Sequence, residues 1–390
     1  MKIFMEKLSL LSLSLILLST FSTSPALPQM ISYYRDKGLP SPQVELLFSI
    51  PSMAIIFILL ITPWLSKKLS EKHMIIFGLL LTALGGGLPV VSQSYLLVFV
   101  SRLLLGSGIG FINARAISVI SEYYQGKERR KLLGLRGSFE VLGNAGLTAL
   151  VGLLLTFGWS KSFMIYFLAL PILVLYLVFA PKKVVKGTND KIKTKGQKVP
   201  KADLTYIVAL AILAGFVITI NTGINLRIPL LVVEFGLGTP AQASLVLSAM
   251  MLMGIIAGMT FGQLIAMFHK QLIPICLVLF SLTLLGVGLP SNLMVLTISA
   301  MASGFLYSLM VTAVFSLVAD RVEYSLVGSA TTLVLVFCNI GGASAAILLS
   351  CFDHLLGQIN AVFYVYAILS LAVGMIYFFK RLFLRKCNVY

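Results

Sequence analysis

A chain of 390 residues that is 58% hydrophobic and only 11% charged is excluded from the water-soluble globular proteins, whose charged fraction is about 25%. Its mean hydropathy of +1.00 is typical of an integral membrane protein. A net charge of +17 would suggest nucleic-acid binding in a soluble protein, but here the basic residues lie in short loops between apolar runs, where they set membrane orientation. We therefore expect no nucleic-acid partner. The four cysteines lack metal-ligand spacing, so we also expect no metal and no cofactor.

The first apolar run, residues 8–30, imitates a secretory signal peptide, because Lys2 and Lys7 precede it and small residues occupy 22–26. Cleavage would leave an odd number of spans and would place the basic linker and the basic C-terminus on opposite sides of the membrane. A retained first span fits the rest of the chain better, and a signal peptide is the alternative.

Apolar runs of about twenty residues recur along the chain, each long enough to cross the hydrocarbon core as a helix. Barrel strands would be about ten residues long with alternating polarity, so a barrel is not expected. Twelve spans are predicted, at residues 8–30, 43–65, 74–93, 95–119, 132–156, 160–180, 204–227, 240–267, 271–289, 292–319, 326–351 and 358–380.

Residues 181–203 form the only long polar run, with eight lysines, two acidic residues and no aromatic residue. Such a segment cannot bury enough apolar surface to offset the entropy of ordering, so we expect a mobile tether. The predicted organisation is therefore an N-terminal bundle over 1–180, a basic cytoplasmic linker over 181–203 and a C-terminal bundle over 204–390.

The distribution of charge predicts the orientation of these spans, because short loops rich in Lys and Arg stay in the cytoplasm. With the N-terminus inside, the cytoplasmic segments hold 23 of the 30 basic residues. The outer segments hold only Arg35, Lys37, Lys161 and Arg227. We therefore predict a multi-pass protein of the plasma membrane with both termini in the cytoplasm.

The two halves also match each other in loop lengths and hydropathy when one is shifted by about 198 residues. This shift places spans 1, 2 and 4 on spans 7, 8 and 10. The predicted fold class is an all-α membrane protein with twelve transmembrane helices in two pseudosymmetric six-helix bundles. Transporters with this layout bind their substrate between the halves, near the bilayer midplane.

Two motifs carry a family resemblance. The fourth span reads Arg102-Leu-Leu-Leu-Gly106-Ser-Gly108-Ile-Gly110, and a basic loop followed by a glycine-spaced helix covers 126–137. The first motif resembles the R-x-x-x-G-x-G-x-G pattern of the major facilitator superfamily, and the resemblance extends over the whole chain. The chain looks most like the twelve-span drug and metabolite exporters of bacteria. The resemblance implies transport by alternating access, with spans 1, 4, 7 and 10 around a central cavity in a monomer.

Two departures from the family pattern concern the mechanism. In the loop after span 2, Lys67 stands where the family has an aspartate that helps to hold the outward-facing state, and Ser70 stands where it has a glycine. The fifth span reads Gly143-Asn-Ala-Gly146 and lacks the Gly-Pro pair typical of antiporters. How this protein latches, and whether it exchanges protons, stay open at this point.

Charged residues within the spans are candidates for transport and coupling. Arg102 lies inside span 4, where a charge is expensive unless it faces a cavity or a partner. Glu140 is the only acidic residue well inside a predicted span, and a carboxylate there suits proton coupling. Alternatively, Arg136, one turn earlier on the same helix face, pairs with it as a structural ion pair. For Arg136 and Arg115, near the inner ends of their spans, a structural role with snorkelling to the interface is favoured.

Neutral residues complete the candidates. Asn221 and Asn225 lie four residues apart, hence on one face of span 7. For these two residues, substrate binding and packing against a neighbouring helix are equal alternatives. The candidates for the substrate cavity are Asn221, Asn225, Asn113 and Tyr307. Small residues allow helices to approach closely. The predicted helix-packing glycines are Gly106, Gly108, Gly110, Gly143 and Gly146.

Function follows from this layout. We favour a secondary active transporter and not an enzyme. It is expected to export a small lipophilic or amphipathic compound in exchange for protons. The alternative is uptake or exchange of a small metabolite or sugar. A membrane-embedded enzyme is the second class, but His73, His269 and His354 all lie at span ends or in loops. A receptor without transport is the third class. An ATP-driven pump is excluded because the chain has no P-loop.

Overall fold

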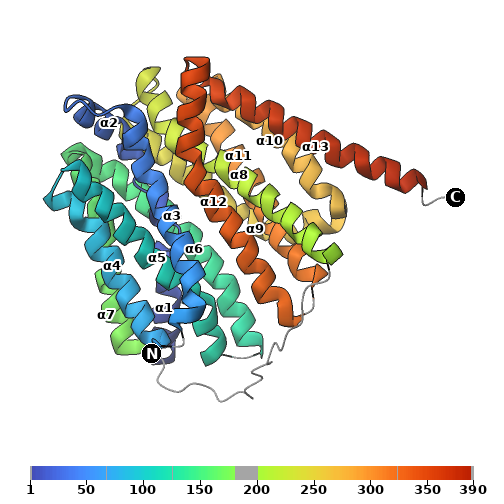
Figure 1. The fold of residues 1–390 in the computed structure, drawn as a ribbon, viewed down its shortest axis with the longest axis horizontal. Coiled ribbons are helices and arrows are strands. Elements are labelled where there is room, and N and C mark those ends of the chain that lie inside the picture. Colours follow the sequence, from blue (N-terminus) through green and yellow to red (C-terminus); the bar gives the residue numbers. More distant parts are fainter. Residues whose placement is uncertain (1, 67, 125, 181–200, 323, 388–390) are drawn as a thin grey trace. The chain divides into compact units, whose positions relative to one another are not determined.

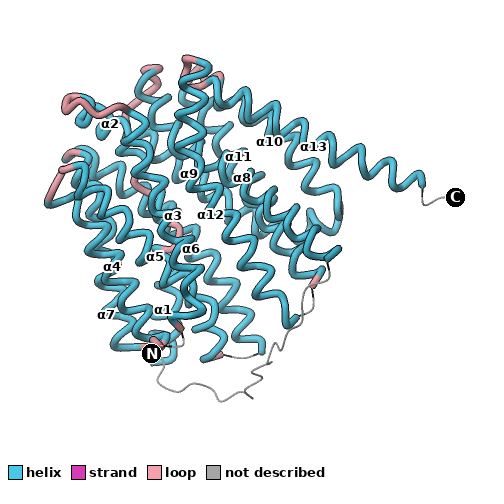
Figure 2. The backbone as a smooth tube through the Cα atoms, in the orientation of Figure 1, coloured by secondary structure: helices cyan, strands magenta, loops and turns pink. Residues whose placement is uncertain are grey.

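The computed structural model describes residues 2–66, 68–124, 126–180, 201–322 and 324–387, and these residues form helices and short connections without a strand. Figures 1 and 2 show the order and course of the helices. Contacts between residues divide the chain into two compact units, and the first contains the elements up to α7 together with Pro240–Ser248. The elements up to α7 are α1 (Lys2–Ser12), η1 (Leu13–Ile16), η2 (Ser19–Phe21), η3 (Ser24–Ala26), α2 (Leu27–Arg35), α3 (Ser41–Leu65), α4 (Glu71–Val91), α5 (Tyr95–Tyr123), α6 (Gly126–Leu154), η4 (Leu155–Phe157), η5 (Trp159–Leu168) and α7 (Ala169–Phe179).

The second unit contains α8, the rest of α9 and all later elements. Within it, α8 packs along α12, and α10 packs along α13. Most of the predicted linker, residues 181–200, lies outside the described residues. The helices are α8 (Lys201–Glu234), α9 (Pro240–Phe268), η6 (His269–Gln271), α10 (Leu272–Gly288), α11 (Leu293–Arg321), α12 (Tyr324–Leu356) and α13 (Ala361–Cys387).

The helices match the predicted spans in number and order. Among the described residues, ten helices are long and apolar enough to cross a membrane, and a bent pair over 4–35 forms an eleventh if it is one span. The ninth predicted span corresponds to α10, an apolar helix of 17 residues. The all-α fold class of the sequence analysis is therefore confirmed.

The first span is not a continuous helix. Its two parts, Phe4–Ile16 and Ser19–Arg35, meet at an angle of 45°, and short 3-10 turns replace α-helix between α1 and α2. Pro25 and Pro28 lie at the starts of η3 and α2, where proline is tolerated because its missing N–H would have no partner inside the helix. The two prolines therefore account for the break in the helix.

Two helix boundaries differ from the prediction, with consequences for charged residues. The seventh predicted span ends at Arg227, but α8 continues through Pro229 to Glu234. Arg227 is therefore a buried residue inside a helix and not the last residue of a span. Similarly, α12 runs five residues past the predicted end of span 11, so that Asp353 lies within it. Both spans were ended too early at charged or polar residues.

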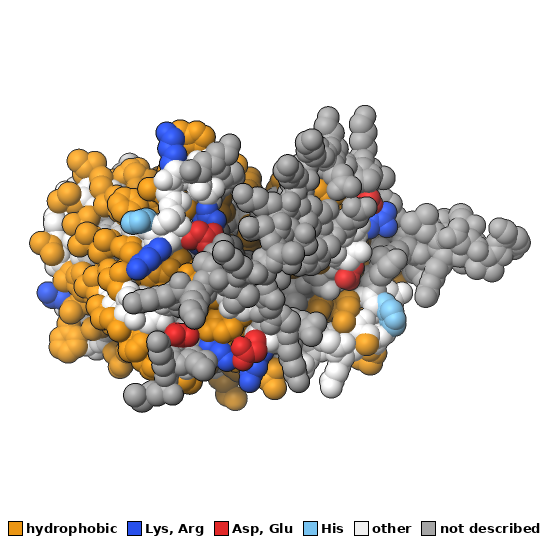
Figure 3. Space-filling model, turned by 90° about the horizontal axis from the view of Figure 1, so that it is seen from below, with side chains coloured by type: hydrophobic (Ala, Val, Ile, Leu, Met, Phe, Trp, Pro, Cys, Tyr) orange, Lys and Arg blue, Asp and Glu red, His pale blue; other side chains and the backbone are white. Residues whose placement is uncertain are grey.

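Apolar side chains face outward from these helices, as a lipid environment requires. Figure 3 shows orange hydrophobic side chains over much of the visible surface, with charged side chains on the face viewed. Helix starts are stabilised locally: Ser70 caps α4, and Asn292 caps α11 by accepting a hydrogen bond from the Val295 N–H at 2.9 Å.

Candidate functional site

Arg102 lies inside the first unit, in the aromatic surroundings of α4 and η5. Its side chain is only 2% exposed. One guanidinium nitrogen donates to the Gly86 carbonyl at 3.4 Å and to the Ser101 hydroxyl at 3.2 Å, and the guanidinium carbon lies 4.4 Å from the Phe163 ring centre and 5.4 Å from that of Tyr166. No carboxylate among the described residues pairs with it. The cation is thus held by aromatic faces and neutral groups.

A polar stripe runs along α6 through Arg136, Glu140, Asn144 and Thr148, which are spaced four residues apart. Arg136 donates to Glu140 at 2.5 Å, and the two side chains are 15% and 18% exposed. The predicted one-turn spacing therefore does bring this pair together. Because the residues at i and i+4 share a face of a helix, these side chains form a stripe along α6. At Asn144 the stripe meets the broken first span, which contacts α6 along η1, η2 and η3.

The contact between α6 and the broken first span, the α1–α6 seam, is close and polar. The Ser22 hydroxyl donates to the side-chain amide oxygen (Oδ1) of Asn144 at 2.7 Å. A Cβ atom at Gly143 would lie 2.1 Å from the Leu15 carbonyl oxygen, so only glycine allows this approach. Further hydroxyls from the first span are buried without a hydrogen-bond partner among the described residues, namely those of Ser14, Thr23 and Ser24. Buried hydroxyls of this kind can bind a substrate group or water.

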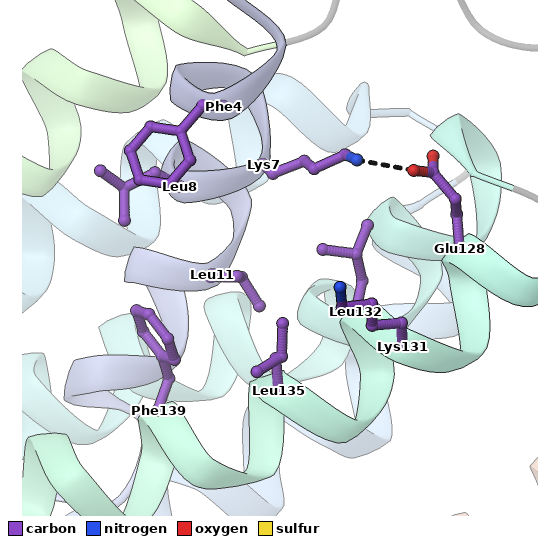
Figure 4. A pocket seen from close by; sticks show the side chains of 9 residues that line it. All are labelled: Phe4, Lys7, Leu8, Leu11, Glu128, Lys131, Leu132, Leu135 and Phe139. Carbon is purple, nitrogen blue, oxygen red and sulfur yellow. Dashed lines mark hydrogen bonds and ion pairs between the residues drawn. The ribbon is translucent and has the colours of Figure 1, made fainter. Parts of the chain in front are cut away.

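At one end of the seam lies an open, mostly apolar cavity of about 330 Å³ between α1 and α6. Figure 4 shows Lys7 reaching from α1 to Glu128 on α6 at its edge, with an N–O distance of 2.7 Å. The apolar side chains that line it are Phe4, Leu8, Leu11, Leu132, Leu135 and Phe139. An amphipathic molecule would find an apolar wall and charged groups within one cavity.

Arg115 does not stand alone at the end of α5. It donates to Glu71, in the first turn of α4, at 2.7 Å, and both side chains are partly buried. The pair ties the start of α4, which follows the loop after the second span, to the second half of α5. Lys67, which replaces the family's aspartate, lies outside the described residues.

The four residues expected in a substrate cavity are divided between the two units. Asn225 is buried on α8, and its amide donates to the Asn221 carbonyl on the same helix at 2.8 Å. Asn113 on α5 belongs to the first unit and Tyr307 on α11 to the second, and both are half-buried. The role of these residues in substrate binding stays a prediction.

The predicted packing glycines divide into two groups. At Gly106, Gly108 and Gly110 a Cβ would lie within 3.0 Å of Pro51, of Gly78 and Thr82, and of Ile58, respectively, so each sits at a close helix contact, as Gly143 does. Gly146 is different, because a Cβ there would meet no atom within 4 Å. Gly146 is exposed on α6, three residues from Gly143, and its role in helix packing stays a prediction.

Sequence reasoning missed one buried and one half-buried acidic position. Glu45, near the start of α3, is 3% exposed, although its place near a predicted span end suggested contact with water. Asp353 on α12 pairs with Arg227 on α8. Their only signal in the sequence is that each lies beside a long apolar run.

Comparisons with known proteins agree with this architecture. A sequence profile described as Major Facilitator Superfamily matches residues 9–265 and 210–386. The Quinolone resistance protein NorB of Staphylococcus aureus is 27% identical over 151 residues, which is 38% of this chain and 30% of NorB. The match therefore spans less than a third of that relative.

Solved structures show the same fold at low sequence identity. The nucleoside transporter NupG has a TM-score of 0.70 at 16% identity, covering 95% of this chain and 99% of NupG. A peptide transporter, POT, in complex with sulfate has a TM-score of 0.72 at 15% identity, covering 96% of this chain and 93% of POT. Because the profile matches nearly the whole chain, this multi-pass membrane protein belongs to the Major Facilitator Superfamily of transporters.

Proposed function

We propose that this carrier exports a small lipophilic or amphipathic compound in exchange for protons, with Glu140 as a proton-binding group. The carrying observation is the Arg136–Glu140 pair, partly buried within α6 and continued by Asn144 along the α1–α6 seam. A carboxylate that forms an ion pair with an arginine one turn away has two arrangements, paired when ionised and released when protonated.

The mechanism uses the chain's own residues in two steps. A proton on Glu140 removes the negative charge that holds Arg136, so the arginine turns toward water or an anionic group of a ligand. Loss of the proton restores the Arg136–Glu140 pair, so that Arg136 no longer binds water or the ligand. Since Ser22 and Asn144 lie on the same seam, ligand hydroxyl or amide groups bound there are exposed to this change of charge.

The proposed direction of transport and the proposed class of substrate are supported by a similar protein and by the apolar cavity. The region of similarity to a quinolone resistance protein favours export, because removal of an amphipathic drug is one way to confer resistance. The apolar cavity with Lys7 and Glu128 at its edge fits an amphipathic ligand. The fold likeness to a nucleoside and a peptide transporter favours the second candidate, uptake of a small polar metabolite. A place in the plasma membrane with both termini inside follows from the charge distribution.

Flux through the purified protein in liposomes tests the proposal. Liposomes with an acidic interior contain the wild type or Glu140→Gln, and uptake of ethidium, norfloxacin, a nucleoside or glucose is followed after the gradient is imposed. Protons leaving the liposome should drive ethidium or norfloxacin inward in the wild type. In Glu140→Gln this gradient-driven accumulation should be lost, whereas exchange of the same probe without a gradient should persist.

Glu234→Gln is the matched control, because Glu234 is an exposed carboxylate at the end of α8 and its loss should leave accumulation unchanged. Accumulation by Glu140→Gln equal to the wild type would show that the proton uses another group. Accumulation of only the nucleoside or glucose, and only when the liposome interior is alkaline so that protons move inward with the solute, would support the second candidate instead.

A further inference from the structure

The cavity between α1 and α6 has a charged end and an apolar wall, and the proposed coupling through Glu140 does not use it. Lys7, Glu128 and Lys131 lie at its charged end. Lys7 is paired with Glu128, and their side chains are 28% and 60% exposed. Lys131 is exposed and forms no ion pair among the described residues. This end of the cavity is therefore accessible from outside the protein and carries more positive than negative charge.

The apolar wall continues from this end along both helices. Figure 4 shows Leu11, Leu132 and Leu135 between the charged pair and Phe139. From Glu128 to Phe139 the wall follows α6 for eleven residues, which is about 16 Å at about 1.5 Å rise per residue. The hydrocarbon core of a bilayer is about 30 Å thick, so this wall has the depth of one leaflet.

The size and exposure of the cavity fit an alkyl chain. Its volume of about 330 Å³ lies at the small end of ligand sites, which measure about 300–1,000 Å³. Leu11 and Leu132, which line it, are only 6% and 4% exposed, whereas Phe4 is 66% exposed. A chain in this cavity would therefore cover buried leucines on one side and stay in contact with the surrounding bilayer on the other.

The charged end favours an anionic group. Residues 127–131 contain four basic residues and one acidic residue, and the charge distribution predicts that this end faces the cytoplasm. Basic cavities between transmembrane helices on that side bind the headgroups of anionic lipids. Lys7 has three N–H donors and uses one for Glu128. Two donors of Lys7 and three of Lys131 can therefore reach phosphate oxygens.

We propose that this cavity binds an anionic phospholipid of the inner leaflet, with one acyl chain along the apolar wall and the phosphate held by Lys7 and Lys131. The pairing with Glu128 keeps the Lys7 side chain extended from α1 toward α6 at the edge of the cavity. The amphipathic compound of the proposed function combines apolar and polar groups in a similar way, and the experiment separates the two ligands. The inference goes beyond that function, because lipid binding requires neither a proton gradient nor transport.

Native mass spectrometry of the full chain tests the site without transport. The wild type in detergent is titrated with phosphatidylglycerol or with phosphatidylcholine of the same acyl chains, and the affinity for the first bound lipid is measured. Phosphatidylglycerol should bind more tightly. Each lysine near an anionic lipid surface contributes about a fivefold factor in affinity. Lys7→Gln with Lys131→Gln should therefore weaken phosphatidylglycerol binding by about 25-fold and change phosphatidylcholine binding little.

Matched controls separate this site from general attraction to the protein. Lys37→Gln with Lys161→Gln removes the same charge from two exposed lysines outside the cavity and should leave the affinity unchanged. Leu135→Trp tests the apolar wall, because each methylene group that the indole displaces costs about a factor of four in affinity. Displacing two should cost about 15-fold. Leu142→Trp, at an exposed position of the same helix outside the cavity, should have no effect.

Equal phosphatidylglycerol affinities of the wild type and the Lys7→Gln, Lys131→Gln variant would overturn the proposal, and so would binding that Leu135→Trp does not weaken. Thermal unfolding shows which variants are folded, and if Leu135→Trp is not, the lysine variant decides alone. Norfloxacin binding that depends on these residues in a protein that binds no phosphatidylglycerol would also overturn the proposal and assign the cavity to the exported compound. If the wild type moves no probe in liposomes, the proposed export fails while the lipid result stands.

Discussion

Replacing Gly143 by alanine tests the close approach of α6 to the broken first span. The added Cβ would lie 2.1 Å from the Leu15 carbonyl oxygen and 2.5 Å from the Leu15 Cα. Both are backbone atoms, so no side-chain rotation relieves the overlap. We expect α6 to move away from η1, and the Ser22–Asn144 hydrogen bond beside it to be strained or lost.

The magnitude follows from three opposing contributions. Alanine is favoured over glycine in a helix by about 0.5–1 kcal/mol. Overpacking a close contact destabilises by about 1–3 kcal/mol, and by more when backbone must shift. Loss of one hydrogen bond adds about 1 kcal/mol. Gly143→Ala should therefore be destabilised by about 1–3 kcal/mol after the helix preference is subtracted.

Gly146→Ala is the matched control on the same helix, because its Cβ would meet nothing within 4 Å. It keeps the helix preference without the overlap and should be neutral or slightly stabilised. Thermal unfolding of both purified variants in one detergent, followed by tryptophan fluorescence, gives the comparison. Equal midpoints for Gly143→Ala and Gly146→Ala would refute the argument that this glycine is required by the contact.

Two further predictions concern the arginines of the first unit. Arg102→Ala should lower both thermal stability and transport, because it removes a buried cation that contacts two aromatic rings. A cation–π contact contributes about 0.5–2 kcal/mol. If Arg102→Lys and Arg102→Ala have the same unfolding midpoint, the rings do not hold the cation. Arg115→Ala should lower the unfolding midpoint, since it takes this partner from the mostly buried Glu71 carboxylate, and it should alter the rate of ethidium flux. The reversed pair Arg115→Glu with Glu71→Arg should restore that rate, and a failure to do so would exclude a simple charge tie between α4 and α5.

Local features could be predicted from the sequence because they depend on residues that are close together in the chain. Apolar length predicted the helical spans, since a lipid environment leaves the backbone no other hydrogen-bond partners. The four-residue spacing of Arg136 and Glu140 predicted a shared helix face, and the structure places them as an ion pair. The glycine motif of the fourth span indicated the family, which the profile match confirms.

Only the tertiary structure decided the features that join distant residues. Arg227 and Asp353 are 126 residues apart, and the predicted spans ended at Arg227 and two residues before Asp353. In the folded chain each residue neutralises the charge of the other, so both helices continue past the pair. In the same way, the sequence does not distinguish Gly143 from Gly146, but in the folded chain Gly143 faces the first span and Gly146 faces open space. A sequence states which groups can pair or pack, and the packing of helices determines which of them do.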